Sequence, residues 1–197
     1  MLPGGKLYVP AAEKLIPNLD RLTDQARKDC VFLVSDACVH SPDDPEFRRF
    51  PPHCVRCTEG AEIIPETVAD RVLVLPNRHD ARVPEDLTAY QQVILEKQTL
   101  DVFDNPLTDV VLERLQKFTD PDAEFFVFGV VTEYCVRFVA KGLLARGRRV
   151  SLVEDAIQTL KTEDGTSALA EMKSSGAQTI TTRQALDSVL DSKAKQA

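Results

Sequence analysis

The sequence predicts a single α/β domain in which a mostly parallel β-sheet lies between helices on both faces. Two observations favour this fold class. Short, continuous apolar runs of strand-like length alternate along the chain with longer stretches whose apolar residues recur at helical spacing. The length of 197 residues and the content of 43% hydrophobic and 28% charged residues also fit one globular domain. We therefore assign residues 1–197 to a single domain.

The expected elements follow one another from the N-terminus. A helix is predicted over 11–28, where Leu15, Leu19 and Leu22 share one face. Buried parallel strands are typically continuous apolar runs. On this basis the expected strands are 31–34, 72–75, 125–128, 150–153 and 179–181. The expected helices between and after them lie near 86–97, 106–118, 133–146, 166–174 and 182–192, and residues 191–197 are expected to fray.

Composition narrows the possible functions. A net charge of −7 argues against binding to a phosphate backbone, and no apolar stretch reaches membrane-spanning length. The N-terminus has no basic segment followed by a long apolar run. We expect a cytoplasmic protein that binds neither nucleic acid nor membrane and acts on a small molecule. The odd number of cysteines, five, favours free thiols over a disulfide framework.

Cys135 is the strongest candidate for a nucleophile. The sequence passes from the apolar run 125–128 through Gly129 into the helical stretch 133–146, which places Cys135 in the first turn of a helix. Free N–H groups and the helix dipole stabilise an anion there and lower a thiol pKa from about 8.5 toward neutrality. Ligands also bind where the strands of open α/β sheets end. A small buried residue without chemistry is the structural alternative.

The segment GVVTEYCVRFVAKGLLARGRRVSLVEDAI, residues 129–157, resembles the signature of the isochorismatase-like cysteine hydrolases, which include nicotinamidases. The resemblance implies a Rossmann-like three-layer fold and a Cys135 that attacks a carbonyl carbon. It implies a cis peptide between Val130 and Val131, with the N–H groups of Val131 and Cys135 as oxyanion donors. Lys97, in LEKQTLDVFDNP, is similar to the family's lysine, whose positive charge favours the ionised thiol.

The resemblance also implies a third catalytic residue, an Asp at the end of the family's first strand, shortly before a Pro-Gly-Gly turn. This chain begins at that turn, with MLPGGKLYVPAAE, so the first strand and its Asp are expected to be missing. A start codon assigned too late, a truncation, and a member without normal activity remain open as explanations. Loss of a central strand would expose two sheet edges. The sequence nominates no substitute for the Asp.

The segment 35–67, which is long for a loop and lacks hydrophobic periodicity, contains a candidate metal site. Its histidines and carboxylates suit one divalent ion of Zn, Mn or Fe. In nicotinamidases an Asp-x-His pair and a later His hold a metal, and His53 matches the later ligand. For the pair, counting from the strand selects Asp36, whereas counting back from DDPEF selects His40 and puts Cys38 at the Asp position. We take Asp36, His40 and His53 as the expected ligands.

Aromatic residues complete the expected site. Phe50 stands where the family has a Trp that stacks on a flat substrate ring, and core packing is its alternative role. Phe103 and Tyr134 are expected to line the same pocket. The resemblance implies hydrolysis of nicotinamide or a similar small amide to an acid and ammonia, in a family that commonly forms homo-oligomers. Isochorismatase activity, ureido or carbamoyl amidase activity, a catalytically impaired binding subunit, and thiol-based redox or metal storage remain alternatives.

Overall fold

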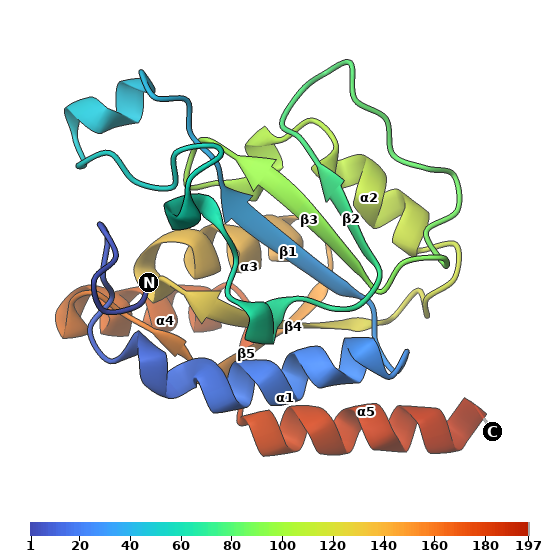
Figure 1. The fold of residues 1–197 in the computed structure, drawn as a ribbon. Helices are drawn as coiled ribbons and strands as arrows, with labels where there is room; N and C mark the ends of the chain where they lie inside the picture. The colour runs from blue at the N-terminus through green and yellow to red at the C-terminus, as the bar shows by residue number, and fades with distance from the viewer. Residues whose placement is uncertain (197) are drawn as a thin grey trace.

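The computed structural model, which describes residues 1–196, contains two parallel three-stranded sheets flanked by helices (Figure 1). The first sheet has the order β1-β3-β2, formed by β1 (Leu33–Cys38), β2 (Val72–Leu75) and β3 (Gln92–Lys97). The second has the order β4-β5-β6, formed by β4 (Glu124–Val130), β5 (Arg149–Gln158) and β6 (Gln178–Ile180). Every strand pair is parallel, which confirms the predicted α/β class.

Five helices are described around the two sheets. They are α1 (Ile16–Arg27), α2 (Thr108–Leu115), α3 (Arg137–Ala145), α4 (Thr162–Ser174) and α5 (Thr182–Gln196). Helices α1 and α5 lie side by side and bury Leu19 and Ala185 against Val153 of β5 (Figure 1). Helices α2, α3 and α4 contribute to a larger core with β3, β4 and β5. Helix α5 extends into the segment 191–197 that was expected to fray, and Ala197 lies outside the described residues.

The prediction of a helix near 86–97 is wrong, because residues 92–97 form the central strand of the first sheet. All six residues of β3 are buried, including the polar Gln92. Its side chain donates a hydrogen bond to Ser35 Oγ and accepts one from the N–H of Ala69. Polar residues at both ends of β3 gave the segment a helix-like pattern. Long-range partners, which the local pattern does not reveal, let these residues lie inside the protein.

Strands β1 and β4 are each paired on one side only, β1 with β3 and β4 with β5. The expectation that the family's first strand is missing stays a prediction. The carboxyl ends of β1 and β4 nevertheless meet, since the Cys38 thiol at the end of β1 hydrogen-bonds Cys135 just beyond β4. Side chains from both sheets therefore meet where the carboxyl ends of β1 and β4 lie.

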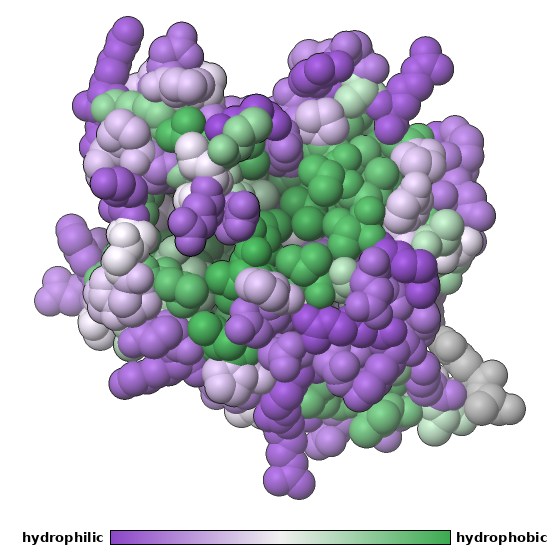
Figure 2. Space-filling model, in the orientation of Figure 1, coloured by the Kyte–Doolittle hydropathy of each residue, from purple (hydrophilic) through white to green (hydrophobic). Residues whose placement is uncertain are grey.

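The face of the molecule drawn in Figure 2 carries a band of apolar residues across its middle, where Figure 1 shows the strands. Hydrophilic residues cover most of the surface above and below this band. Among residues 1–196, no helix combines the length and apolar character needed to cross a membrane.

Candidate active site

Cys135 lies in a π-helical turn, Thr132–Val136, that joins the end of β4 to the start of α3. The Val136 N–H donates to the Val131 carbonyl five residues earlier at 3.2 Å, which gives the turn its wide pitch. Wide turns of this kind occur frequently at functional sites. The predicted cis peptide between Val130 and Val131 is present immediately before the turn. Cys135 thus sits at the entrance to a helix, as the sequence predicted.

Gly129 redirects the chain just before this turn. Its φ of +118° is a conformation that residues with a side chain rarely adopt, so glycine is required here. The register of β4 on β5 shifts between Val127 and Gly129. Such irregularities bend a strand and change the direction of the residues that follow it. The sequence signal for this feature is the lone glycine between an apolar strand and a helix.

Lys97, the last residue of β3, is completely buried beside Cys135. Its Nζ lies 2.8 Å from Asp36 Oδ1, donates to the Leu100 carbonyl at 3.0 Å, and hydrogen-bonds Cys135. Burying an ammonium is costly unless its donors are satisfied. Here three acceptors from separate segments fix the ammonium next to the thiol.

The strand register explains why these groups meet. Cys38 of β1 pairs with Lys97 of β3 in a parallel ladder, so their side chains emerge on the same face. Asp36 shares that face because it precedes Cys38 by two residues. The sequence prediction brought Cys135 and Lys97 together but gave no role to the Cys38 thiol.

The surroundings of Cys135 favour its thiolate. The hydrogen bond from Cys38 and the positive charge of Lys97 lower the pKa of Cys135 to about 7, although burial and the charge of Asp36 oppose them. The pKa of Cys38 is raised by the same hydrogen bond, so Cys38 is the proton donor of the pair. Burial lowers the pKa of Lys97, but Asp36 and Cys135 raise it more, and the net shift is upward. A cation therefore faces the nucleophile at neutral pH.

A candidate metal centre lies in the loop after β1. Ligand atoms of His40, Glu46 and His53 lie within 4.8 Å of one another. The His40 Nε2 is buried without a hydrogen-bond partner, while its Nδ1 contacts Asp44 Oδ2 at 3.0 Å. A histidine held by a carboxylate at one nitrogen and free at the other is the usual arrangement of a metal ligand. These residues fit a divalent ion with nitrogen and oxygen ligands.

The structure brings together two of the three metal ligands expected from the sequence, His40 and His53, and adds Glu46 to them. The Asp36 carboxylate is instead paired with Lys97. Glu46 was missed because it lies in a short 3-10 turn, Pro45–Arg48, within a segment that has no periodicity. The family's spacing of ligands offered no signal for it.

Hydrogen bonds close the loop after β1 and tie it to the first sheet. The His40 N–H donates to the Cys54 carbonyl at 2.9 Å, and the Arg56 N–H donates to the His40 carbonyl at 2.9 Å. The Arg56 guanidinium also binds both carboxylate oxygens of Glu96, next to Lys97, at 3.0 and 2.7 Å. Paired bonds of this kind fix orientation well. The loop that carries the candidate metal ligands is thereby attached to β3 at the residue before Lys97.

Residues 1–184 match the family described as the isochorismatase domain. The chain belongs to this family. A nicotinamidase of Escherichia coli strain K12 is 23% identical to it, and the match covers 88% of this chain and 86% of that protein.

Solved structures show the same isochorismatase-like fold. A pyrazinamidase of Pyrococcus horikoshii in complex with zinc is 29% identical, with a TM-score of 0.71 and coverage of 91% of this chain and 92% of that one. An N-carbamoylsarcosine amidase from Thermoplasma acidophilum matches in fold with a TM-score of 0.69 at 23% identity, over 91% of this chain and 89% of that one.

The aromatic residues of this isochorismatase-family chain occupy three different environments. The Phe50 ring lies edge-on to His53, with centroids 6.4 Å apart, so Phe50 borders the candidate metal centre. Phe47, which the sequence did not single out, packs against both His40 and His53. The Phe103 ring lies 3.7 Å below the Arg146 guanidinium and against α3.

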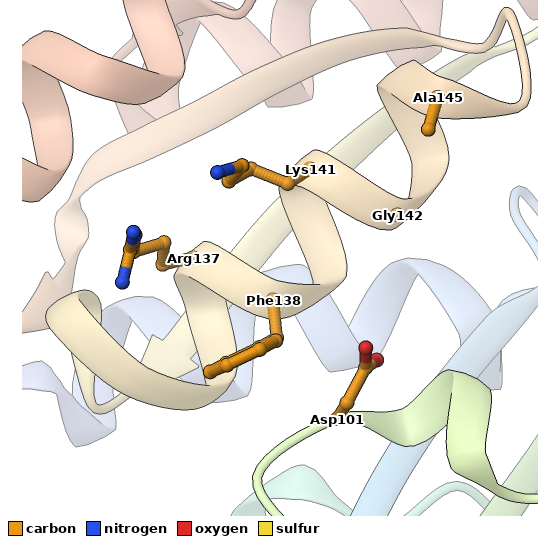
Figure 3. A pocket seen from close by; sticks show the side chains of 6 residues that line it. All are labelled: Asp101, Arg137, Phe138, Lys141, Gly142 and Ala145. Carbon is orange, nitrogen blue, oxygen red and sulfur yellow. The ribbon is translucent and has the colours of Figure 1, made fainter.

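A pocket of about 300 Å³ lies along α3 and is lined by residues that include Arg137, Lys141 and Asp101 (Figure 3). Tyr134 lines a neighbouring pocket together with Glu133, Arg137 and Glu171. Cys135 lines neither of these two pockets. The expectation that Phe50, Phe103 and Tyr134 line one substrate pocket therefore stays a prediction.

Glu133 is a buried residue of the nucleophile turn that the sequence did not reveal as important. Its carboxylate accepts hydrogen bonds from Thr159 Oγ1 at 2.7 Å and from the N–H groups of Leu160 and Lys161 at 3.0 and 3.2 Å. These bonds join the turn that carries Cys135 to the segment leading into α4. Glu133 thus supports the position of the nucleophile without facing it.

Proposed function

We propose that this isochorismatase-family chain hydrolyses the carboxamide of nicotinamide, or of a similar flat amide, to the carboxylic acid and ammonia. The observation that carries the proposal is the buried Lys97 ammonium, which hydrogen-bonds Cys135 and stabilises its thiolate. A thiolate is the reactive form of cysteine, and a pKa near ambient pH suits a nucleophile that must also leave. The likeness to a nicotinamidase and a pyrazinamidase supports this substrate class.

In the proposed reaction the Cys135 thiolate attacks the amide carbon. The N–H groups of Val131 and Cys135 stabilise the negative charge that develops on the carbonyl oxygen. Ammonia leaves, a thioester forms, and water hydrolyses the thioester to restore Cys135. The Lys97 ammonium stays beside the sulfur throughout and favours the thiolate each time it is released. Phe50 offers an aromatic surface for a flat substrate ring.

We assign the metal site of the proposed enzyme to His40, Glu46 and His53, with Glu46 in place of the Asp36 expected from the sequence. Zinc, manganese and iron all suit this set of nitrogen and oxygen ligands. The bound ion would act as a Lewis acid that holds the substrate's ring nitrogen. Asp44 holds the His40 ring through its Nδ1, which would leave Nε2 free to bind the ion.

Replacing the nucleophile tests the reaction. We predict that Cys135→Ala lowers ammonia release from nicotinamide by about a thousandfold or more, because no thioester can form. Cys30→Ala is the matched control, since Cys30 lies after α1 with its thiol on the Lys28 carbonyl, away from Lys97. Ammonia release is measured by a coupled assay at saturating substrate. Normal turnover in Cys135→Ala would refute the proposal.

Removing a metal ligand tests the metal centre. We predict that His53→Ala, purified without an affinity tag, loses its divalent metal and binds nicotinamide less tightly. His79→Ala, which removes an exposed histidine, should retain both properties. Metal content is measured by mass spectrometry and the Michaelis constant by the ammonia assay. Equal metal content in the two variants would contradict the assignment of this ligand set.

A further inference from the structure

The Asp36 carboxylate has no assigned role once the metal is placed on His40, Glu46 and His53. It lies 2.8 Å from Lys97 Nζ, and its side chain is only 20% exposed. Among residues 1–196 it has no other ion-pair or side-chain hydrogen-bond partner in the structure. A partly buried carboxylate therefore points at the cation of the active site and at nothing else.

Asp36 is also electrically coupled to the nucleophile. Its charge acts on Cys135, on Cys38 and on Lys97, so all four groups form one cluster. Lys97 stands in the middle of this cluster, since its ammonium bonds Asp36 on one side and Cys135 on the other. The arrangement forms a continuous chain of hydrogen-bonding groups from a carboxylate to a thiol.

We propose that Asp36 is the carboxylate that exchanges protons with Cys135 through Lys97. The inference rests on the proposed amide hydrolysis and names a carboxylate for its proton transfers. Asp36 is a positioning residue in this scheme, because it contacts Lys97 and does not touch the substrate.

The proton balance of the reaction is complete with this carboxylate. When the thiol of Cys135 ionises, Lys97 passes a proton to Asp36 and takes up the proton of the thiol in its place, so the ammonium is restored. The thiolate attacks the amide, and on collapse of the tetrahedral intermediate the proton returns from Asp36 through Lys97 to the departing amine, which leaves as ammonia. When water attacks the thioester, its proton follows the same route to Asp36 and back to the Cys135 sulfur as the acid leaves. No further reactant is needed.

Asp36→Asn, which keeps the shape of the side chain and removes its charge, is the central test. We expect kcat for nicotinamide to fall by about a hundredfold or more with little change in KM, as for loss of acid and base catalysis. An activated ester such as a p-nitrophenyl ester needs no proton on its leaving group, so its burst of p-nitrophenolate, which reports thioester formation alone, should slow far less. Asp36→Glu should restore part of the amide activity. Asp43→Asn, with the same charge change at an exposed position, is the control.

A second readout does not depend on turnover. The rate of iodoacetamide alkylation at Cys135, followed by peptide mass spectrometry across pH, reports the thiolate. Its charged and titratable neighbours are Cys38 and Asp36 on β1, Lys97 on β3, and Cys54 in the metal loop. Asp36 is an anion that opposes the thiolate, so Asp36→Asn should move the alkylation midpoint to lower pH while amide turnover falls. A purely structural role would not produce opposite changes in thiolate content and activity.

The outcomes separate this inference from the function on which it rests. If the wild type releases ammonia but Asp36→Asn keeps its amide turnover, or leaves the alkylation midpoint unchanged, the role of Asp36 is overturned alone. Equal losses in the rates of thioester formation from amide and ester would also overturn it, since proton return to the leaving group would then not be involved. If the wild type releases no ammonia from amides, the proposed function fails first and the proton return fails with it.

Discussion

At the scale of single residues, the reactivity of Cys135 depends on two neighbours of different kinds. Cys38 provides a hydrogen bond to the sulfur, and Lys97 provides a buried positive charge. The resemblance to the family predicted the second neighbour and not the first, because Cys38 was considered only as a candidate at a metal-ligand position. Cys38 lies beside Lys97 because β1 pairs with β3, and a local sequence pattern does not encode this pairing.

The role of Cys38 leads to a prediction about pH. The hydrogen bond from Cys38 is the largest influence that lowers the pKa of Cys135, so Cys38→Ala should raise that pKa above about 7. The thiolate fraction at neutral pH then falls, and the midpoint of iodoacetamide alkylation at Cys135 moves to higher pH. Cys38→Ser keeps a hydrogen-bond donor and should shift the midpoint less. An unchanged midpoint in Cys38→Ala would show that the sulfur atoms do not interact.

At the scale of elements, the nucleophile turn depends on supports that lie outside it. Gly129 allows β4 to bend, and Glu133 joins the turn to the segment before α4. The sequence located the turn well because strand, glycine and helix are contiguous there. It failed at β3, where six consecutive buried residues form a strand whose polar side chains are satisfied by β1 and the loop before β2. Local patterns thus identified elements with local causes and missed one that depends on distant partners.

Glu133→Ala should destabilise the fold. The change leaves the N–H groups of Leu160 and Lys161 without their acceptor in a part-buried site, at a cost of about 1–3 kcal/mol in the free energy of unfolding. Glu113→Ala, which truncates an exposed glutamate on α2, should change it by about 0.5 kcal/mol or less. Urea unfolding measures both variants. Similar stabilities would mean that Glu133 does not anchor the turn.

At the scale of the whole molecule, the parallel strands divide into two sheets, each with a central strand and two edge strands. Strands β3 and β5 have a neighbour on each side, whereas β1 and β4 have one. The fold class was predictable because it follows from the alternation of strands and helices along the chain. The division into two sheets depends on which strands find partners in space.

Hydrogen exchange should reflect this division. Backbone N–H groups of β3 and β5 are expected to exchange more slowly than those of β1 and β4, because edge strands open with less loss of structure. Exchange followed by mass spectrometry at several protein concentrations measures the difference. If the N–H groups of all four strands were equally protected, but only at high protein concentration, a second copy of the chain would be covering the free edges of β1 and β4.

The division also has a chemical consequence. The nucleophile belongs to one sheet and its cation to the other, since Cys135 follows β4 and Lys97 ends β3. The distance between the Cys135 sulfur and the Lys97 ammonium therefore depends on how the two sheets are packed together. The apolar core that contains residues of both sheets sets that distance. A substitution deep in this core, far from the active site, would change the pKa of Cys135. The reactivity of the Cys135 thiol thus reports on the packing between the two sheets.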